Sequence, residues 1–334
     1  MGKNLYDLSV IRRELQYYKK MRIPEGVDEK KYRYEEVIKR PISLVEVSED
    51  DFEDRLFFIE IENNYKLVGY KILVDYFINK GNGIADIDSR IKADMLLGIY
   101  KHMQIENGVI SIMFYCLEPS EKKYAFNKIR KDIDLEITYP IVINADPLKM
   151  PKWEDVWLEI TETKTEEEMI EFLSNTEPHF RKYTEEVLKK RGENKFVIFD
   201  PACSTGEFLE YVKIKFPDAY TIGHDMDEKM IKIAKNRVDE FACCNAFDSP
   251  ILPKSIDILV LRFLNYAVVS REEAENLFEK LIKTVKEDGL IICFGHTPVL
   301  LDGRFFMKQG LNMVGKIGYE ESTDSIFQYY VLKR

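Results

Sequence analysis

The chain has 334 residues, of which 45% are hydrophobic and 32% are charged, and its formal net charge is −10. This length allows two domains. The acidity disfavours general binding to nucleic acid or to an anionic membrane surface, so we expect neither as a partner. No stretch approaches the roughly 18 apolar residues that a membrane-spanning helix needs. The five cysteines form no CxxC pair, so we expect reduced thiols and a cytoplasmic protein.

We expect residues 1–150 to form a mainly helical domain. Asp7 precedes an apolar stripe at helical spacing, and further helices are predicted at 28–40, 52–61, 67–77, 91–103 and 120–133. Strands are predicted at 109–116 and 137–143. The domain is interpreted either as a structural, dimerising domain or as a cap that closes over a substrate, and a homodimer is one outcome of the first interpretation.

Residues 151–195 are interpreted as a linker followed by lid helices. Thr165 with Glu168 forms a capping-box pattern, and Pro178 begins a helix that carries Tyr183. A helix in this place often lies over the ligand of an α/β sheet, which makes Tyr183 a candidate pocket residue. The alternative is that the helix merely packs on the sheet.

From residue 196 to 334 strands and helices alternate. Apolar runs predict strands at 196–200, 220–224, 241–244, 256–261 and 290–294, and the last two, 313–319 and 326–332, form a hairpin. This order predicts an α/β fold with a seven-stranded, mostly parallel sheet and an antiparallel C-terminal hairpin.

Four polar features follow the carboxyl ends of successive strands, where open α/β sheets bind ligands. The first is Asp200 with the small residues 202–206, which lead into a helix N-terminus. Asp225 follows the second strand, where a carboxylate can accept hydrogen bonds from both hydroxyls of a ribose. Asn245 and Ala246 follow the third strand, and Arg262 and Asn265 follow the fourth.

The stretch Asp200-Pro-Ala-Cys-Ser-Thr-Gly206 resembles the first motif of the class I S-adenosylmethionine-dependent methyltransferases, Asp-x-Gly-Cys-Gly-x-Gly. The resemblance covers roughly residues 178–334, and Lys286-Glu-Asp-Gly289 matches the family's turn before the fifth strand. It implies S-adenosylmethionine as the cofactor. It implies that Asp200 and the turn with Ala202, Cys203 and Gly206 face the methionine part, with Asp225 at the ribose, Met226 beside adenine and Asn245 at the adenine amino group. Ala246 and Arg262 are further candidates for cofactor binding from their places after the third and fourth strands, and Arg262 could equally lie at an interface.

The motif departs from the family at two positions, because Ala202 and Ser204 stand where glycine is usual. Small residues still allow a ligand to approach the backbone if their φ angles stay negative. Cys203 is interpreted as a small buried residue and not as a nucleophile. The four histidines are scattered and show no ligand spacing, so no metal site is expected.

His296, just past the fifth strand, is the predicted catalytic base for an acceptor that must lose a proton; the alternative is an ordinary loop histidine. Tyr183, Asn265 and Tyr266 are further candidates for the substrate pocket, and Arg262 suits an acceptor carboxylate. We therefore expect methyl transfer at oxygen or nitrogen to a small-molecule acceptor, with an amino-acid-like or carboxylate-bearing compound as one candidate. Two alternatives stay open: a protein, peptide or RNA methyltransferase, and a cofactor-binding module without turnover.

Overall fold

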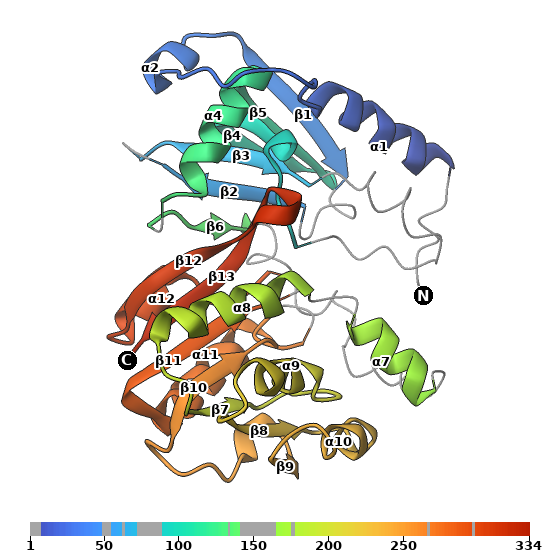
Figure 1. Ribbon diagram of the computed structural model, residues 1–334. Coiled ribbons are helices and arrows are strands. Elements are labelled where there is room, and N and C mark those ends of the chain that lie inside the picture. Colours follow the sequence, from blue (N-terminus) through green and yellow to red (C-terminus); the bar gives the residue numbers. More distant parts are fainter. Residues whose placement is uncertain are drawn as a thin grey trace. The chain divides into compact units, whose positions relative to one another are not determined.

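Figure 1 shows the chain as a computed structural model, which describes residues 8–48, 55–61, 64–71, 89–132, 134–140, 165–174, 178–265, 268–295 and 298–334. The chain divides into two compact units. Unit 1 comprises Met1–Ala145 and Glu321–Phe327, and unit 2 comprises Asp146–Glu320 and Gln328–Arg334. Among the helices that the structure describes, none combines the length and the apolar character needed to cross a bilayer.

Unit 1 is built around a six-stranded sheet in the order β1-β5-β4-β3-β2-β6, in which every neighbouring pair is antiparallel. Its strands are β1 (Ile42–Ser48), β2 (Leu56–Glu60), β3 (Lys66–Tyr70), β4 (Leu96–Glu106), β5 (Val109–Cys116) and β6 (Ile137–Thr138). Its helices are α1 (Leu8–Met21), α2 (Tyr34–Val37), η3 (Ala93–Met95), α4 (Pro119–Ile129) and the hairpin turn η7 (Glu321–Thr323).

Helices cover the two faces of this sheet. Met21 of α1 packs in a core cluster with Val68, while the neighbouring Leu67 shares a small pocket with Ile129 of α4. Because consecutive strand residues point to opposite faces, α1 and α4 lie on opposite sides. Both faces of β2 and β3 are therefore buried, which is why these strands are apolar without alternation.

The expectation of a mainly helical first part is wrong. The segments predicted as helices at 52–61, 67–77 and 91–103 contain β2, β3 and β4, and the helix predicted at 28–40 is reduced to the single turn α2. The strand β5 and the helices α1 and α4 lie where the sequence predicts them. Asp7 and residues 141–164, with the predicted linker, lie outside the described part of the chain.

Unit 2 holds a seven-stranded sheet in the order β12-β13-β11-β10-β7-β8-β9. The five strands from β11 to β9 are parallel to their neighbours, and β13 runs antiparallel to β11. The strands are β7 (Val197–Asp200), β8 (Tyr220–Asp225), β9 (Glu240–Cys243), β10 (Ile256–Leu261), β11 (Val285–Phe294), β12 (Asn312–Glu320) and β13 (Ser325–Lys333). The helices are α7 (Glu166–Ser174), α8 (Pro178–Arg191), α9 (Glu207–Lys215), α10 (Glu228–Ala234), η5 (Ala246–Asp248), α11 (Arg271–Leu281), η6 (Ile282–Thr284) and α12 (Gly303–Lys308).

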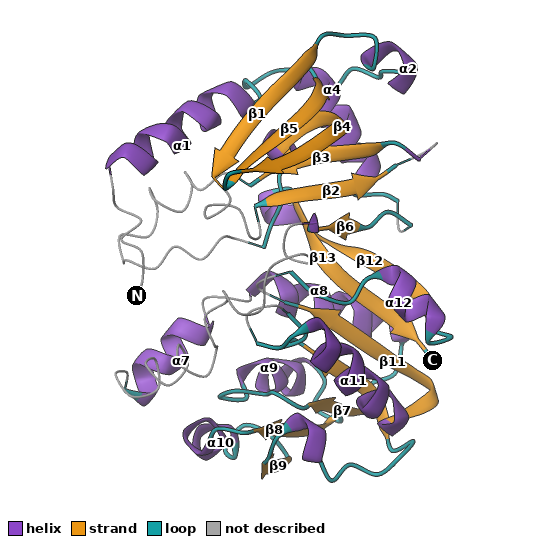
Figure 2. Ribbon diagram, turned by 180° about the vertical axis from the view of Figure 1, so that it is seen from behind, coloured by secondary structure: helices purple, strands orange, loops and turns teal. Residues whose placement is uncertain are grey.

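Helices also sandwich the sheet of unit 2. Helices α8, α9 and α10 lie in front of it in Figure 1, whereas α11 and α12 lie in front in the reverse view of Figure 2. An aromatic stack joins α8 to the sheet, because Phe180 lies 4.6 Å from Phe294 and Phe294 lies 5.1 Å from Tyr329, centroid to centroid. Each of these three side chains is fully buried. The stack fixes α8 beside the strand ends that carry the predicted site.

Candidate functional site

The turn between β7 and α9, Asp200–Gly206, is held in one conformation by its own backbone. The amide N–H of Cys203 donates to the His224 carbonyl at 2.7 Å, and that of Gly206 donates to the Cys203 carbonyl at 3.0 Å. Gly206 has a φ angle of 80° and precedes the helix α9. A side chain at this position would be strained, and its Cβ would lie 3.2 Å from Ala234. The glycine at the end of the motif is therefore required by the local structure.

The two positions where glycine is replaced behave differently. Ser204 has a φ angle of 53°, whereas Ala202 is not among the residues with positive φ. A small residue with negative φ is expected to let a ligand approach the backbone closely. This expectation of negative φ is met at Ala202 and not at Ser204. The chain keeps at Ser204 the left-handed backbone that glycine favours, although a non-glycine residue pays about 1–2 kcal/mol for it.

Two arginines brace the turn through the Asp200 carboxylate and two backbone carbonyl oxygens. Arg262 donates from Nε to Asp200 Oδ2 at 2.8 Å and from Nη2 to the Ala202 carbonyl at 3.1 Å. Arg237 donates from Nη1 to the Thr205 carbonyl at 3.2 Å. Asp200 has no exposed surface, and it also accepts from the Ala202 N–H. The ion pair between Asp200 and Arg262 therefore holds the start of the turn in place.

Asp225, at the end of β8, faces the same turn. Its Oδ2 accepts from the Ser204 N–H at 2.8 Å, and its Oδ1 accepts from the Asp227 N–H at 3.0 Å. Burial raises the pKa of this carboxyl group, and the two N–H donors oppose the rise. The structure thus brings together Asp225 and the Asp200–Gly206 turn, as the order of motifs predicts.

The residues predicted beside adenine follow β8 and β9 at the same edge of the sheet, where Asp225 is paired with Cys243. Met226 is 63% exposed. Asn245 is also exposed, and its side-chain oxygen accepts from the Phe247 N–H at 2.9 Å, which caps η5 with Ala246 as its first residue. An apolar side chain and an amide therefore border an open surface beyond Asp225.

The predicted acceptor residues are less well supported by their contacts. The Tyr183 hydroxyl donates to the Ile317 carbonyl at 3.2 Å, and its ring meets that of Tyr329 edge-on. Asn265 is buried and lies in a β-bridge with Val299. Both residues thus serve the local fold. Tyr266 and His296 lie outside the described residues.

Sequence reasoning missed the polar residues that support the turn from neighbouring elements. No motif marks Arg237, which follows α10, or the buried His224, whose Nδ1 lies 3.1 Å from Ser249 Oγ. Burial lowers the pKa of His224. The one available signal for His224 is its place directly before Asp225 on a buried strand.

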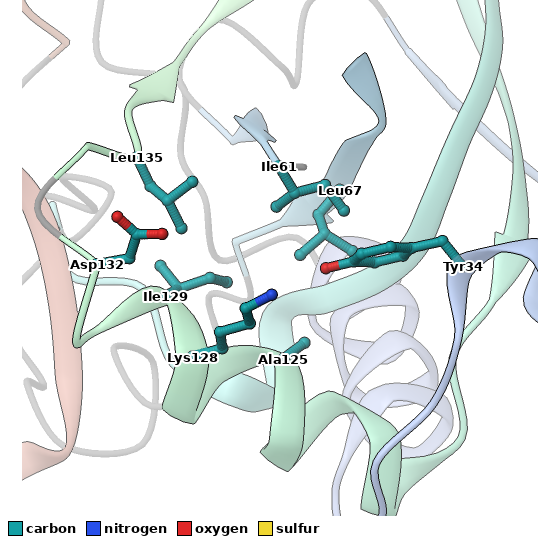
Figure 3. Close-up of a pocket in the computed structure, with 8 residues that line it drawn as sticks. All are labelled: Tyr34, Ile61, Leu67, Ala125, Lys128, Ile129, Asp132 and Leu135. Atoms are coloured by element: carbon teal, nitrogen blue, oxygen red, sulfur yellow. The ribbon is translucent and has the colours of Figure 1, made fainter. Parts of the chain in front are cut away.

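The structure also contains a small pocket in unit 1 (Figure 3). Tyr34 and Lys128 point into it, and its full lining is Tyr34, Ile61, Leu67, Ala125, Lys128, Ile129, Asp132 and Leu135. Its cavity volume is about 10 Å³. One buried water needs roughly 10–15 Å³, so this pocket is too small for an acceptor. Among the described residues no cluster of three or more potential metal ligands occurs.

Comparison with known proteins places this site within a matched domain. Residues 198–289, which include Asp225 and the whole Asp200–Gly206 turn, match the model of a methyltransferase domain. Isonocardicin synthase from Nocardia uniformis subsp. tsuyamanensis is 29% identical over 297 residues, which cover 88% of this chain and 96% of that protein.

Two solved structures show weaker similarity. A SAM-dependent methyltransferase from Leishmania major is 15% identical, with 56% of this chain and 85% of that one covered and a TM-score of 0.43. The plantazolicin methyltransferase BpumL in complex with SAH is 16% identical, with 49% and 89% covered and a TM-score of 0.38. The matched domain and the relative that aligns over most of the chain support a class I S-adenosylmethionine-dependent methyltransferase.

Proposed function

We propose that this enzyme transfers the methyl group of S-adenosylmethionine to an oxygen or nitrogen atom of a small-molecule acceptor. The observation that carries the proposal is the pairing of Asp225 with the Asp200–Gly206 turn at the carboxyl edge of the parallel strands. The relative that matches almost end to end is named for making isonocardicin, which supports a small acceptor.

The residues at this edge suit the nucleoside part of the cofactor. A carboxylate offers about four lone-pair positions, and each oxygen of Asp225 uses one of them on a backbone N–H. Both oxygens therefore keep the capacity to accept a ribose hydroxyl. In this arrangement Met226 and Ala246 flank adenine, and Asn245 meets its amino group.

The turn suits the methionine part. Ala202, Cys203 and Gly206 supply backbone groups, and the proposal gives the buried Asp200 the role of holding Arg262 and the turn in place. The Arg262 side chain is 12% exposed, so its guanidinium can meet a carboxylate of the cofactor or of the acceptor. Bound here, the cofactor supplies an activated methyl group on its sulfonium.

The chain's own contribution to chemistry is alignment of the acceptor and exclusion of water. We retain His296 as the base for an acceptor that must lose a proton, with Tyr266 as a neighbouring pocket residue. Arg262 favours an acceptor that carries a carboxylate. Tyr183 and Asn265 act in this proposal through the packing of the pocket wall.

The proposal predicts that Asp225→Asn weakens S-adenosylmethionine binding by roughly 1–3 kcal/mol, because charge-assisted hydrogen bonds to the ribose are lost. Titration calorimetry measures this, with the exposed Asp248→Asn as a matched control that should leave affinity unchanged. In the wild type, affinity should also fall as the pH drops through the raised pKa of Asp225, because the protonated carboxyl accepts less well. The Asp225→Asn variant should lose that dependence.

Turnover is tested with carboxylate-bearing small acceptors and quantification of the sulfur-containing product. A sulfonium carries three carbon substituents, so S-adenosylhomocysteine among the products identifies the methyl as the transferred group. Absence of binding heat for both S-adenosylmethionine and S-adenosylhomocysteine would refute the proposal. Turnover that leaves a thioether other than S-adenosylhomocysteine would also refute it, because a group other than the methyl would then have been transferred.

A further inference from the structure

Glu207, the first residue of α9, lies directly after the Asp200–Gly206 turn and faces two arginines. Its Oε1 lies 3.4 Å from Arg237 Nη1, and its Oε2 lies 4.0 Å from Arg181 Nη2. Arg237 is the residue that braces the Thr205 carbonyl, and Arg181 is the fourth residue of α8. One carboxylate thus bridges α8, the turn and the segment that follows α10.

Stability alone does not account for this carboxylate. The Glu207 side chain is 11% exposed. Burial raises its pKa, and the attraction of Arg181 and Arg237 opposes that rise without cancelling it. Separations of 3.4 and 4.0 Å also exceed the 2.7–2.9 Å or so of a strong charge-assisted hydrogen bond. A half-buried ionised group held this loosely adds little to folding, because its desolvation offsets its ion pairs.

Its location suggests a different use. The first turn of α8 also carries Phe180, which stacks on Phe294 at the end of β11. The position of α8 relative to the turn therefore sets the packing at the carboxyl end of β11, in the sheet whose strand ends carry the proposed cofactor site. Glu207 is the acidic group in contact with both α8 and Arg237, and an acidic residue suits the first turn of α9.

We infer that Glu207 is a positioning residue, which holds Arg181 of α8 and Arg237 against the turn and thereby sets the affinity for S-adenosylmethionine. The inference rests on the proposed cofactor site. Glu207 acts through the two arginines and has no part in the chemical step. Its charge should therefore influence cofactor binding and leave the rate at saturating cofactor unchanged.

The test uses the full chain with Glu207→Gln, which keeps the shape and removes the charge. We expect the KM and Kd for S-adenosylmethionine to rise roughly tenfold, with kcat within twofold of the wild type. Glu210→Gln is the matched control, because Glu210 contacts the same Arg237 at 3.3 Å from one turn further along α9, and its side chain is 42% exposed. It should change KM by less than twofold.

A double variant separates positioning from general destabilisation. Because Glu207 acts through Arg181, adding Arg181→Gln to Glu207→Gln should weaken binding by much less than the sum of the two single effects, as coupled residues do. Equal affinity in Glu207→Gln and the wild type would overturn the inference, as would a loss confined to kcat or an equal effect of Glu210→Gln. If the wild type itself binds no S-adenosylmethionine, the proposed function fails instead, so the two failures are distinguishable.

Discussion

At the scale of single residues, the two replaced glycines of the first motif have opposite consequences. Ser204 occupies a left-handed backbone conformation and Ala202 does not. The Ser204 side chain gains only a weak contact, from Oγ to Met230 Sδ at 3.6 Å. The backbone strain at Ser204 therefore exceeds the stabilisation from its side-chain contact. Ala202 shows no such strain.

This difference predicts opposite effects for the same kind of substitution. Ser204→Gly should raise the free energy of unfolding by about 0.5–1 kcal/mol, because relief of the left-handed strain exceeds the entropy that glycine adds to the unfolded chain. Ala202→Gly should lower it by about 0.5–1 kcal/mol, because only the entropy changes. Urea unfolding of both variants measures the two values. The same sign for both would show that backbone strain does not govern the turn.

The places of the candidate residues that follow a strand could be predicted, and those of the residues that support the turn could not. Asp200, Asp225 and Asn245 stand at fixed places relative to apolar strands, so their meeting at one edge follows from the topology of a parallel sheet. Arg237 and Glu207 lie beside the turn because of how α8, α9 and α10 pack together, which the local sequence does not reveal. Nothing local distinguishes Arg237 among the 49 lysines and arginines of the chain.

At the scale of elements, the end of β8 combines Asp225, the proposed ribose ligand, with a buried histidine. His224 lies beside Ser249 and Cys244, and its ring meets Phe199 edge-on. Burial lowers its pKa below the ordinary value of 6.5, and the charge of Glu240 opposes this shift without cancelling it. At pH values between the folded-state pKa and the unfolded-state pKa, the imidazole is therefore neutral in the folded protein and protonated in the unfolded one.

The sign of the resulting pH dependence follows from linkage. The stabilisation from neutral His224 is present above the unfolded pKa near 6.5, and it is lost as the pH falls through the lower folded pKa. We expect the wild type to lose more unfolding free energy between pH 7.5 and 5 than His224→Gln, which cannot titrate. Urea unfolding at both pH values measures the loss in each protein. Subtracting the loss of the variant from that of the wild type removes the contribution of the carboxylates, which both proteins share. A larger loss in the variant would contradict the assignment.

The elements of the two units differ in how well their sequence specifies them. In unit 2, strands buried on both faces alternate with capped helices, and each predicted strand overlaps its observed one. In unit 1, Ile91, Met95, Ile99 and Met103 recur every four residues. That spacing keeps side chains near one face of a helix and also on one face of a strand, so it does not distinguish them. The segment is the strand β4 from Leu96 onward, and pairing with β3 and β5 decides the outcome.

At the scale of the whole molecule, the last strand belongs to both units. Ser325–Phe327 falls in unit 1 and the rest of β13 in unit 2. Within unit 1, Ile326 and Ile91 exchange backbone hydrogen bonds of 2.7 and 2.9 Å, and Arg130 pairs with Asp324 at 2.8 Å. Unit 1 is thus discontinuous in sequence, and a cut at the predicted linker would remove part of it. The expected dimer and the role of unit 1 as a cap stay predictions.

This shared strand predicts that the units do not unfold independently. Ile326 is fully buried, so Ile326→Ala should cost about 2–4 kcal/mol through lost contacts and a residual cavity. Because β13 continues from Ile326 into the ladder with β11, loosening its first residues should also weaken the pairs that follow. Hydrogen exchange should therefore quicken in β4 of unit 1 and in β13 of unit 2. Val314→Ala on β12, where the side chain is 49% exposed, is the control and should cost no more than about 0.5 kcal/mol. Faster exchange confined to unit 1 would show that the two units open separately despite their common strand.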